Sequence, residues 1–258
     1  MKKVLLAVVA AVAMFSLAGC GDKSASKKFI LGLDASFPPM GFTEANGEIV
    51  GYDIDLGKEV TKRLGLELEI KPINWDAKEM ELNSHSIDCI WSGFTITDER
   101  KAAMSFTEAY LDNDQVLVVR ADSGINSLAD AAGKTVGVQS GSSAEEAIND
   151  NADFAASLKK LVSYEENLTA LTDLEVGGVD GVVMDSIVAE YTIKTGNLPL
   201  VCVSESLAKE GYGIGFRKDE KGAKLRDDVW ATLVEMSKDG TVATISEKWF
   251  GKDISVIK

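Results

Sequence analysis

Short apolar runs alternate with helix-like segments along this sequence from Phe29 onward. The run KFILGLD precedes GYDIDLGKEVTKRLG, in which Leu56, Val60 and Leu64 share one face, because a helix repeats about every 3.6 residues. The strand-like runs LELEIKPI and IDCIW follow, separated by another helix-like segment. Strands that alternate with helices form parallel sheets, since each connection is long enough to hold a helix. The pattern therefore predicts an α/β fold with mostly parallel sheets.

Capping residues indicate where the helices begin and end. Asp53 is placed to cap the helix that carries Leu56, and Gly65 is placed to end it. Asp76, with Glu79 three residues later, marks the start of the next helix. In the second half we expect a short helix in SLADAAG and another in SSAEEAIND.

The order of elements repeats in the second half of the chain. ELNSHSIDCIWSG and DLEVGGVDGVVMD each contain a helix end, a turn, an apolar residue, an aspartate and a buried strand. We infer two lobes of like construction, with the C-terminal segment packing back on the first. Lobe 1 is expected at 29–111 and 212–258 and lobe 2 at 112–211. The chain then crosses twice, near 112–114 and 210–212, and two adjacent crossings form a hinge.

Composition excludes several classes of function. The net charge of −14 gives no electrostatic footprint for binding nucleic acid. The single histidine, His85, lies in a polar turn without partners at zinc-ligand spacing, so we expect neither a metal site nor a cofactor. Cys89 and Cys202 lie in apolar runs and are expected to be buried thiols, although the sequence leaves a bridge between them open.

The first residues have the features of a targeting segment. MKKVLLAVVAAVAMFSLAGC holds two lysines and then an apolar run of about 14 residues, shorter than the ~20 residues of a membrane-spanning helix. It resembles a bacterial lipoprotein signal with the lipobox LAGC. The resemblance implies a signal peptide at 1–19, lipidation of Cys20 and a flexible tether at 20–28. The alternative is an ordinary secretory signal with a coincidental cysteine.

Polar turns follow the predicted strands, where open α/β sheets bind ligands. In SGFTITDER, Thr97 can cap a helix whose first turn contains Arg100. A cation at a helix N-terminus opposes the helix dipole, so Arg100 is expected to reach an external anion, and its guanidinium matches a carboxylate. Thr95 can add donors, and carbonyl groups near Ser92 and Gly93 can accept from an ammonium.

Two turns of the second half offer complementary groups. Ser142 and Ser143 present hydroxyls and amides for an anion, although each also has a glutamate three residues later, as a capping box does. Asp185 ends an apolar strand, where a carboxylate needs a partner; the alternative is an N-cap for the following helix. Arg100 for an anion and Asp185 for a cation, on facing lobes, would hold the two ends of a zwitterion.

Together these motifs resemble the solute-binding proteins of bacterial ABC importers for polar amino acids. The resemblance covers nearly all of the chain after the tether. It rests on LDASFPPMGF, GEIVGYDIDLGKEV, SGFTITDERKAAMSFTEAY, GKTVGVQSGSSAE and DGTVATISEKWFG. It implies a periplasmic-binding-protein-like fold of type II, with two lobes joined by a double-crossover hinge.

The resemblance also implies a role for each polar turn. Arg100, with the amides of Thr95 and Ser143, would hold the α-carboxylate of a free amino acid. Gly93, Thr95 and Asp185 would hold its α-ammonium.

A second group of residues is implied for the ligand side chain. Asp34 would line its pocket, with Phe37 and Trp75 as aromatic walls and Gln139 and Met184 at further lining positions. For Asp34 the alternative is a turn cap, and for Trp75 it is core packing. An acid beside aromatic walls favours a cationic or amide side chain, such as that of arginine, lysine, histidine or glutamine.

We expect a monomer on the outer face of the cytoplasmic membrane, at the cell surface or in the periplasm, which closes around its ligand and docks on a membrane permease. The main rival is a cyclohexadienyl dehydratase, which acts on prephenate or arogenate. It would need a general acid, and Asp34 and Asp185 already have other roles. A chain with one histidine in a polar turn also lacks a convincing nucleophilic triad. A sensor lobe of a receptor is a third reading.

Overall fold

The computed structural model of the chain describes residues 27–258. The predicted signal peptide at 1–19 and the lipidation site Cys20 lie outside this range, and Lys28, expected in the tether, begins the first strand. A nine-stranded sheet runs through the described residues. Its strands are β1 (Lys28–Leu33), β5 (Glu67–Pro72), β6 (Cys89–Thr95), β7 (Ser105–Phe106), β8 (Leu111–Arg120), β9 (Thr135–Gln139), β10 (Lys160–Tyr164), β11 (Gly181–Asp185) and β12 (Leu200–Phe216).

The strand order explains how one sheet serves two lobes. The path is β10-β9-β11-β8-β12-β6-β1-β5, with β7 paired to β12. β1 pairs in parallel with β5 and β6, and β9 pairs in parallel with β10 and β11. Between these two parallel groups, β8 and β12 run antiparallel to each other and to their neighbours. A smaller sheet contains β2 (Ser36–Phe37), β3 (Gly41–Thr43) and β4 (Ile49–Val50).

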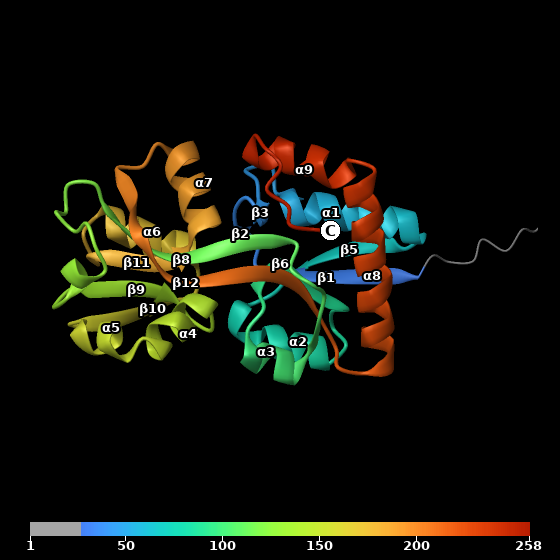
Figure 1. Cartoon of the computed structure of the whole chain (residues 1–258), viewed down its shortest axis with the longest axis horizontal. Helices are drawn as coiled ribbons and strands as arrows, with labels where there is room; N and C mark the ends of the chain where they lie inside the picture. The colour runs from blue at the N-terminus through green and yellow to red at the C-terminus, as the bar shows by residue number, and fades with distance from the viewer. Residues whose placement is uncertain (1–26) are drawn as a thin grey trace, which may run out of the picture.

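Helices flank the sheet in each lobe (Figure 1). Lobe 1 contains the strands β1 to β6 with α1 (Tyr52–Leu64), α2 (Lys78–Asn83), α3 (Asp98–Ala103), α8 (Glu220–Lys238) and α9 (Thr241–Phe250). Lobe 2 contains β9, β10 and β11 with α4 (Ser143–Asp150), α5 (Ala152–Ser157), α6 (Asn167–Glu175) and α7 (Ser186–Gly196). Short 3-10 helices form at Trp75–Ala77 and Ala129–Ala131, the latter where SLADAAG predicted a helix.

Two strands, β8 and β12, connect the lobes (Figure 1). Their ladder pairs Asp112 with Gly211, Asn113 with Glu210 and Asp114 with Lys209, and its register shifts twice between Cys202 and Ala208. The segments predicted to cross, 112–114 and 210–212, are therefore direct neighbours in the sheet. The division of the chain into lobes at these residues stays a prediction.

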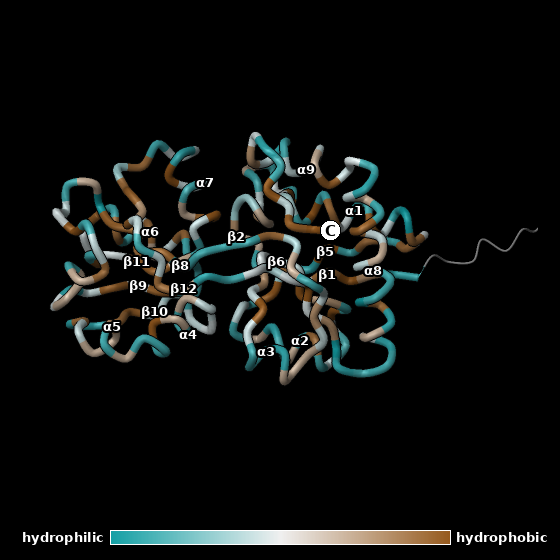
Figure 2. Tube along the Cα trace, in the orientation of Figure 1, coloured by the Kyte–Doolittle hydropathy of each residue, from teal (hydrophilic) through white to brown (hydrophobic). Residues whose placement is uncertain are grey.

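Apolar residues gather along the strands inside each lobe, and polar residues cover the outer surface (Figure 2). One core cluster includes Leu31 and Trp91 of lobe 1 and continues to Val182 and Leu171 of lobe 2. The segments of β8 and β12 between the lobes are more hydrophilic (Figure 2). Each lobe therefore has an apolar interior, while the strands that connect the lobes carry polar residues at the space between them.

The local signals identified most helix ends, with two errors. Gly65 ends α1 in the left-handed conformation, as predicted. Asp76 does not begin the next helical segment, because the side chain of Asn74 accepts from the Asp76 amide. Asp53 does not cap α1 either: Gly51 is the N-cap, and Asp53 lies fully buried in the first turn.

The buried carboxylate of Asp53 links α1 to the strand that reaches the space between the lobes. It accepts from the backbone amide of Gly93 at 2.7 Å and from the hydroxyl of Tyr110 at 3.1 Å. Burial raises the pKa of Asp53 to about 7, against the effect of these hydrogen bonds. The carboxylate therefore holds the backbone of β6 in place at Gly93.

The thiols are free among the described residues. Cys89 is buried and Cys202 is half-buried, and no disulfide joins them. This finding settles the bridge that the sequence left open.

We predict that Asp53→Ala destabilises the fold by about 1–3 kcal/mol, because the Gly93 amide and the Tyr110 hydroxyl lose their buried acceptor. Urea unfolding measures the change. Glu59→Ala on the same helix is the matched control: Glu59 pairs with Lys62 and Arg63 at the surface, so its loss should cost below about 1 kcal/mol. Equal losses for both variants would contradict the role given to Asp53.

Candidate ligand-binding site

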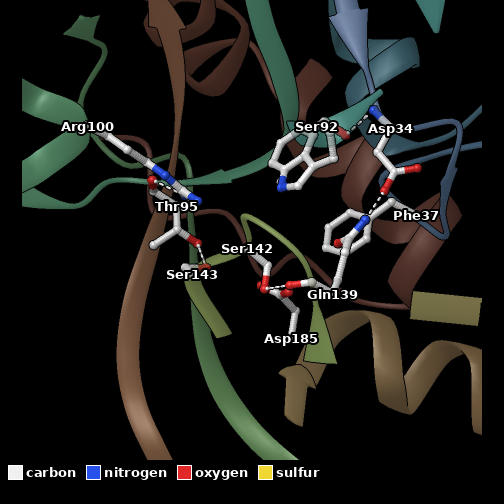
Figure 3. A pocket seen from close by; sticks show the side chains of 11 residues that line it. Asp34, Phe37, Ser92, Thr95, Arg100, Gln139, Ser142, Ser143 and Asp185 are labelled. Atoms are coloured by element: carbon white, nitrogen blue, oxygen red, sulfur yellow. Dashed lines mark hydrogen bonds between the residues drawn. The ribbon is translucent and has the colours of Figure 1, made fainter. Parts of the chain in front are cut away.

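A pocket between the lobes collects the predicted side chains, with Met184 as the exception. About 270 Å³ of space without protein atoms lies among its lining residues, part of it open to solvent. Figure 3 shows Arg100 and Asp34 at opposite ends of it. The residues that line it are Asp34, Phe37, Trp75, Ser92, Gly93, Thr95, Arg100, Gln139, Ser142, Ser143 and Asp185.

The topology explains why these residues meet. Asp34 directly follows β1, Thr95 ends β6, Gln139 ends β9 and Asp185 ends β11. The carboxyl ends of parallel strands lie at one edge of a sheet, where open α/β folds bind ligands. Here the two parallel groups of strands direct these edges toward each other, so that four polar strand ends surround one space.

Met184 lies outside the pocket. It is fully buried in the core cluster that contains Val182, whereas Val183 belongs to a separate cluster in lobe 2. Side chains alternate between the two faces of a strand, so Met184 and its neighbour Asp185 cannot face the same space. The Met184 side chain therefore lies in the core and not at the pocket-lining position that we expected.

One end of the pocket carries a buried guanidinium. Arg100 is only 6% exposed, and it donates to the carbonyl oxygens of Thr95 at 2.9 Å and Gly141 at 3.4 Å. Its guanidinium lies 4.5 Å from the ring centre of Phe94. Within residues 27–258, no carboxylate lies at ion-pair distance from it. Burial lowers the pKa of Arg100, and more distant acids act in the opposite direction.

The backbone around Arg100 is set by the predicted cap. The Thr97 hydroxyl accepts from the Arg100 amide at 3.2 Å, as the sequence indicated. A buried charge without a counter-ion is costly, and a guanidinium binds a carboxylate through two parallel hydrogen bonds. This end of the pocket is therefore suited to a carboxylate.

Hydroxyl groups from both lobes lie beside the guanidinium. The Ser143 hydroxyl donates to the Thr95 hydroxyl at 3.1 Å. Ser142 caps α4 by accepting from the Glu145 amide at 3.2 Å, and it donates to the Gln139 carbonyl at 2.7 Å. The capping interpretation is thus right for the Ser142 side chain, while the Ser143 side chain faces the opposite lobe.

A second charged group of the pocket is the carboxylate of Asp185. It stands at the N-cap position of α7, but its side chain makes no capping hydrogen bond. Its Oδ1 instead accepts from Asn113 Nδ2 at 2.8 Å, Gln115 Nε2 at 3.0 Å and the Tyr212 hydroxyl at 2.8 Å. Burial, followed by the charge of Glu210, raises the pKa of Asp185 to about 7. This environment favours a cation as a further partner.

Three polar residues at this end were missed from the sequence: Asn113, Gln115 and Glu210. They lie on the two connecting strands, which the sequence marked only as a hinge. Asn113 and Gln115 could have been identified together, because side chains two residues apart on a strand point to the same face of the sheet. Glu210 lacks such a signal, since only the pairing of β12 with β8 brings it opposite Asn113.

The far end of the pocket is acidic with aromatic walls. Asp34 Oδ1 accepts from the Ser36 amide at 2.9 Å, so the turn-cap interpretation holds for one oxygen. Its Oδ2 accepts from Gln139 Nε2 at 2.8 Å across the space between the lobes. Phe37 and Trp75 are nearly buried, and Trp75 also packs edge-on against Phe94, at 5.6 Å between ring centres.

The wall of the pocket requires glycine at position 93. Gly93 has φ of +54° within β6, a conformation that side chains rarely adopt. A Cβ there would lie 2.8 Å from Cε1 of Phe37. The adjacent Ser92 hydroxyl accepts from the Asp34 amide at 3.1 Å. These constraints hold the backbone of β6 directly against the ligand space.

Direct hydrogen bonds join the two lobes across the pocket. Besides the Gln139–Asp34 and Ser143–Thr95 bonds, Lys78 Nζ of lobe 1 donates to the Gly141 carbonyl of lobe 2 at 2.9 Å. Lys78 is 6% exposed. Burial and then the charge of Arg100 lower its pKa to about 8. The structure is therefore a closed arrangement in which two cations of lobe 1 hold one carbonyl of lobe 2.

Other kinds of site find no support among the described residues. Residues 27–258 contain no group of three histidine, cysteine, aspartate or glutamate side chains that could hold a metal ion. Over the same range, every helix is too short or too polar to cross a membrane.

Comparison with known proteins identifies the family. Residues 29–252 match the bacterial extracellular solute-binding proteins, family 3. The chain belongs to this family. Membership confirms the predicted resemblance, and the mostly parallel sheet with flanking helices confirms the predicted fold class.

Individual relatives agree over nearly the whole chain. The arginine-binding extracellular protein ArtP of Bacillus subtilis is 34% identical over 97% of this chain and 98% of its own. The L-cystine-binding protein TcyJ of Escherichia coli K12 is 31% identical over 97% of this chain and 94% of its own. The substrate-binding protein of an ABC uptake transporter from Streptococcus pneumoniae, with bound histidine, has a TM-score of 0.86 and 34% identity over 89% of this chain and 94% of its own.

We predict that Lys78→Met opens the lobes in the absence of ligand. A hydrogen bond from a charged donor contributes about 1.5–3 kcal/mol, so the closed fraction should fall about tenfold or more. The radius of gyration from small-angle X-ray scattering should increase. Lys101→Met is the control, because Lys101 is exposed and pairs only with Asp98. An unchanged scattering curve for Lys78→Met would contradict the role of Lys78.

Proposed function

We propose that this protein captures a free amino acid with a cationic or amide side chain and delivers it to an ABC importer. The observation that carries the proposal is the buried guanidinium of Arg100, which faces the pocket and has no carboxylate partner among residues 27–258. Asp185 lines the same pocket from the other lobe. A ligand with one carboxylate and one ammonium satisfies both groups at once, and every α-amino acid carries this pair.

The roles of the pocket residues follow from their placement. We assign the ligand carboxylate to Arg100, with the hydroxyl and amide groups of Thr95 and Ser143. We assign the α-ammonium to Asp185, with backbone oxygens near Ser92 and Gly93. Because Arg100 lies in α3 of lobe 1 and Asp185 ends β11 of lobe 2, one ligand would bridge the lobes through its backbone groups alone.

The side-chain end supports a cationic or amide ligand. Asp34 faces the pocket there between Phe37 and Trp75. Asp34 and Glu165 contribute to raising the pKa of Glu166, after its burial, so several acids lie within electrostatic reach of this end. An acidic ligand side chain would be repelled. The named ligands of the compared relatives, arginine, cystine and histidine, are amino acids.

Closure supplies the mechanism of capture. A ligand stabilises the closed form only through contacts that it makes better there than in the open form. A complete shift of a two-state population, from 99:1 to 1:99, would require about 5.5 kcal/mol of such differential binding, and the contacts between the lobes that form without ligand lower this requirement. Hydrogen bonds to charged groups contribute about 1.5–3 kcal/mol each, so pairing both ends of a zwitterion is of the required size. The closed form would then dock on the permease as a monomer.

We place the mature protein on the outer face of the cytoplasmic membrane, anchored through lipidated Cys20. The support is the lipobox LAGC after a short apolar segment. Several acyl chains give stable anchoring where a single chain does not. Mass spectrometry of the mature N-terminus tests this assignment: an unacylated Cys20 would remove the anchor and leave a secreted protein.

The rival function is a cyclohexadienyl dehydratase. One observation favours it, because the raised pKa of Asp185 suits a general acid in a cleft. The compared relatives argue against it, since they are named for binding arginine, cystine and histidine. Incubation with prephenate or arogenate distinguishes the two functions by the absorbance of an aromatic product.

We predict that arginine, lysine, histidine or glutamine raises the melting temperature of the protein in a screen of the twenty amino acids.

We predict that Arg100→Ala lowers the affinity for the amino acid at least about tenfold in calorimetry, because a hydrogen bond to a charged group contributes about 1.5–3 kcal/mol. Lys101→Ala, the exposed neighbour on α3, should bind normally. Stabilisation only by acidic or aliphatic amino acids, or full affinity in Arg100→Ala, would contradict the proposal.

A further inference from the structure

Two carboxylates lie close together where we assign the ligand ammonium: Asp185 lines the pocket, and Glu210 lines the adjoining space outside it. Asn113 Nδ2 donates to Asp185 Oδ1 at 2.8 Å and to Glu210 Oε2 at 3.2 Å. Gln115 Nε2 donates to the same two oxygens, at 3.0 Å each. Two acidic oxygens that share both of their amide donors must lie close together, and like charges at such separation oppose each other's ionisation.

Glu210 also reaches the groups assigned to the ligand carboxylate. Its Oε2 accepts from the Thr95 hydroxyl at 2.8 Å and lies 3.3 Å from the Ser143 hydroxyl oxygen. One oxygen of Glu210 therefore contacts a strand end of lobe 1, the first residue of α4 in lobe 2, and both side chains on β8 that hold Asp185. These contacts exist together only when the lobes are closed.

The charged surroundings do not neutralise this pair. Asp112, Asp114 and Lys209 line the solvent side of the connecting strands together with Glu210. On the pocket side, Tyr212 donates to Asp185, and Tyr110 lies behind Tyr212, with 6.4 Å between ring centres. Arg100 lies within electrostatic reach of both acids but forms no ion pair with either. Together with Asp185 and Glu210 themselves, four acids lie near only two cations among these residues, Arg100 and Lys209.

We propose that Glu210 completes the ammonium subsite as a positioning residue, and that Asp185 beside it carries a proton until a ligand ammonium takes that place. This inference rests on the proposed function. The balance is simple: the ammonium brings one positive charge, one proton leaves Asp185 for the buffer, and no covalent bond to carbon or nitrogen changes. Capture of an amino acid at mildly acidic pH therefore releases a proton.

The sign of the pH dependence follows from the raised pKa of Asp185, about 7. Above this pH the carboxylate is ionised and ready for the ammonium. Below it, binding must first remove the proton, so the affinity falls by up to about tenfold per pH unit. The guanidinium and ammonium of L-arginine keep their charges through this range, which makes L-arginine the suitable probe.

Isothermal titration calorimetry with L-arginine tests the inference. Titrations at pH 6 in two buffers of different ionisation enthalpy give the number of protons released, which should be close to one for the unmodified protein. Glu210→Gln keeps the size of the side chain but removes the neighbouring charge, which is the second cause of the raised pKa of Asp185 after burial. It should therefore release fewer protons at pH 6 than the unmodified protein, and its pH dependence should move to lower pH. Asp112→Asn removes an exposed acid from the same crossing and should behave as the unmodified protein does.

A second ligand separates the ammonium from the rest of the molecule. The des-amino analogue 5-guanidinopentanoate has no ammonium, so its binding should release no proton. Proton release near zero for L-arginine with the unmodified protein at pH 6 would overturn the inference while leaving amino-acid capture intact. This measurement does not depend on the folding of any variant. Absence of binding by any amino acid at pH 8 would instead overturn the proposed function, and the inference with it.

Discussion

The closed structure depends on one electrostatic condition: the guanidinium of Arg100 is buried at the space between the lobes, and no carboxylate in the part of the chain that the structure describes lies at ion-pair distance from it. Carbonyl oxygens of Thr95 and Gly141 and the face of Phe94 contact it, but they do not cancel its charge. The rest of the pocket is arranged around this condition. Hydroxyl groups surround the guanidinium, and the acids Asp185 and Asp34 lie elsewhere in the pocket. The protein thus keeps open the position that an external carboxylate can fill.

The supporting structure explains how such a charge is held in place. Thr97 caps the helix that carries Arg100, and Asp53 fixes the neighbouring strand through the Gly93 amide. Opposite them, Lys78 and Arg100 both reach the carbonyl of Gly141. The closed form is therefore stabilised partly by contacts of the protein with itself. A ligand adds to these contacts and does not have to supply all of the closing energy.

The sequence predicted the parts of this site that depend on local pattern. Thr97 and Ser142 were found because caps follow short-range rules, and the strand ends were found because apolar runs stop at polar turns. Asp53, Lys78 and Glu210 were missed or misassigned, because their partners Gly93, Gly141 and Asp185 lie far away in the chain. Met184 was placed in the pocket by resemblance, although alternation along a strand already sets it opposite Asp185.

The paired strands β8 and β12 have a consequence for how the lobes move. From Ala208 to Tyr212 each residue of β12 has a partner on β8, so sliding along the strands would break several ladder hydrogen bonds at once. Bending of the ribbon across its face preserves them. Each closure therefore returns the guanidinium of one lobe and the carboxylate of the other to the same separation. The paired strands therefore set the distance between the groups that bind the two ends of a ligand, whatever its side chain.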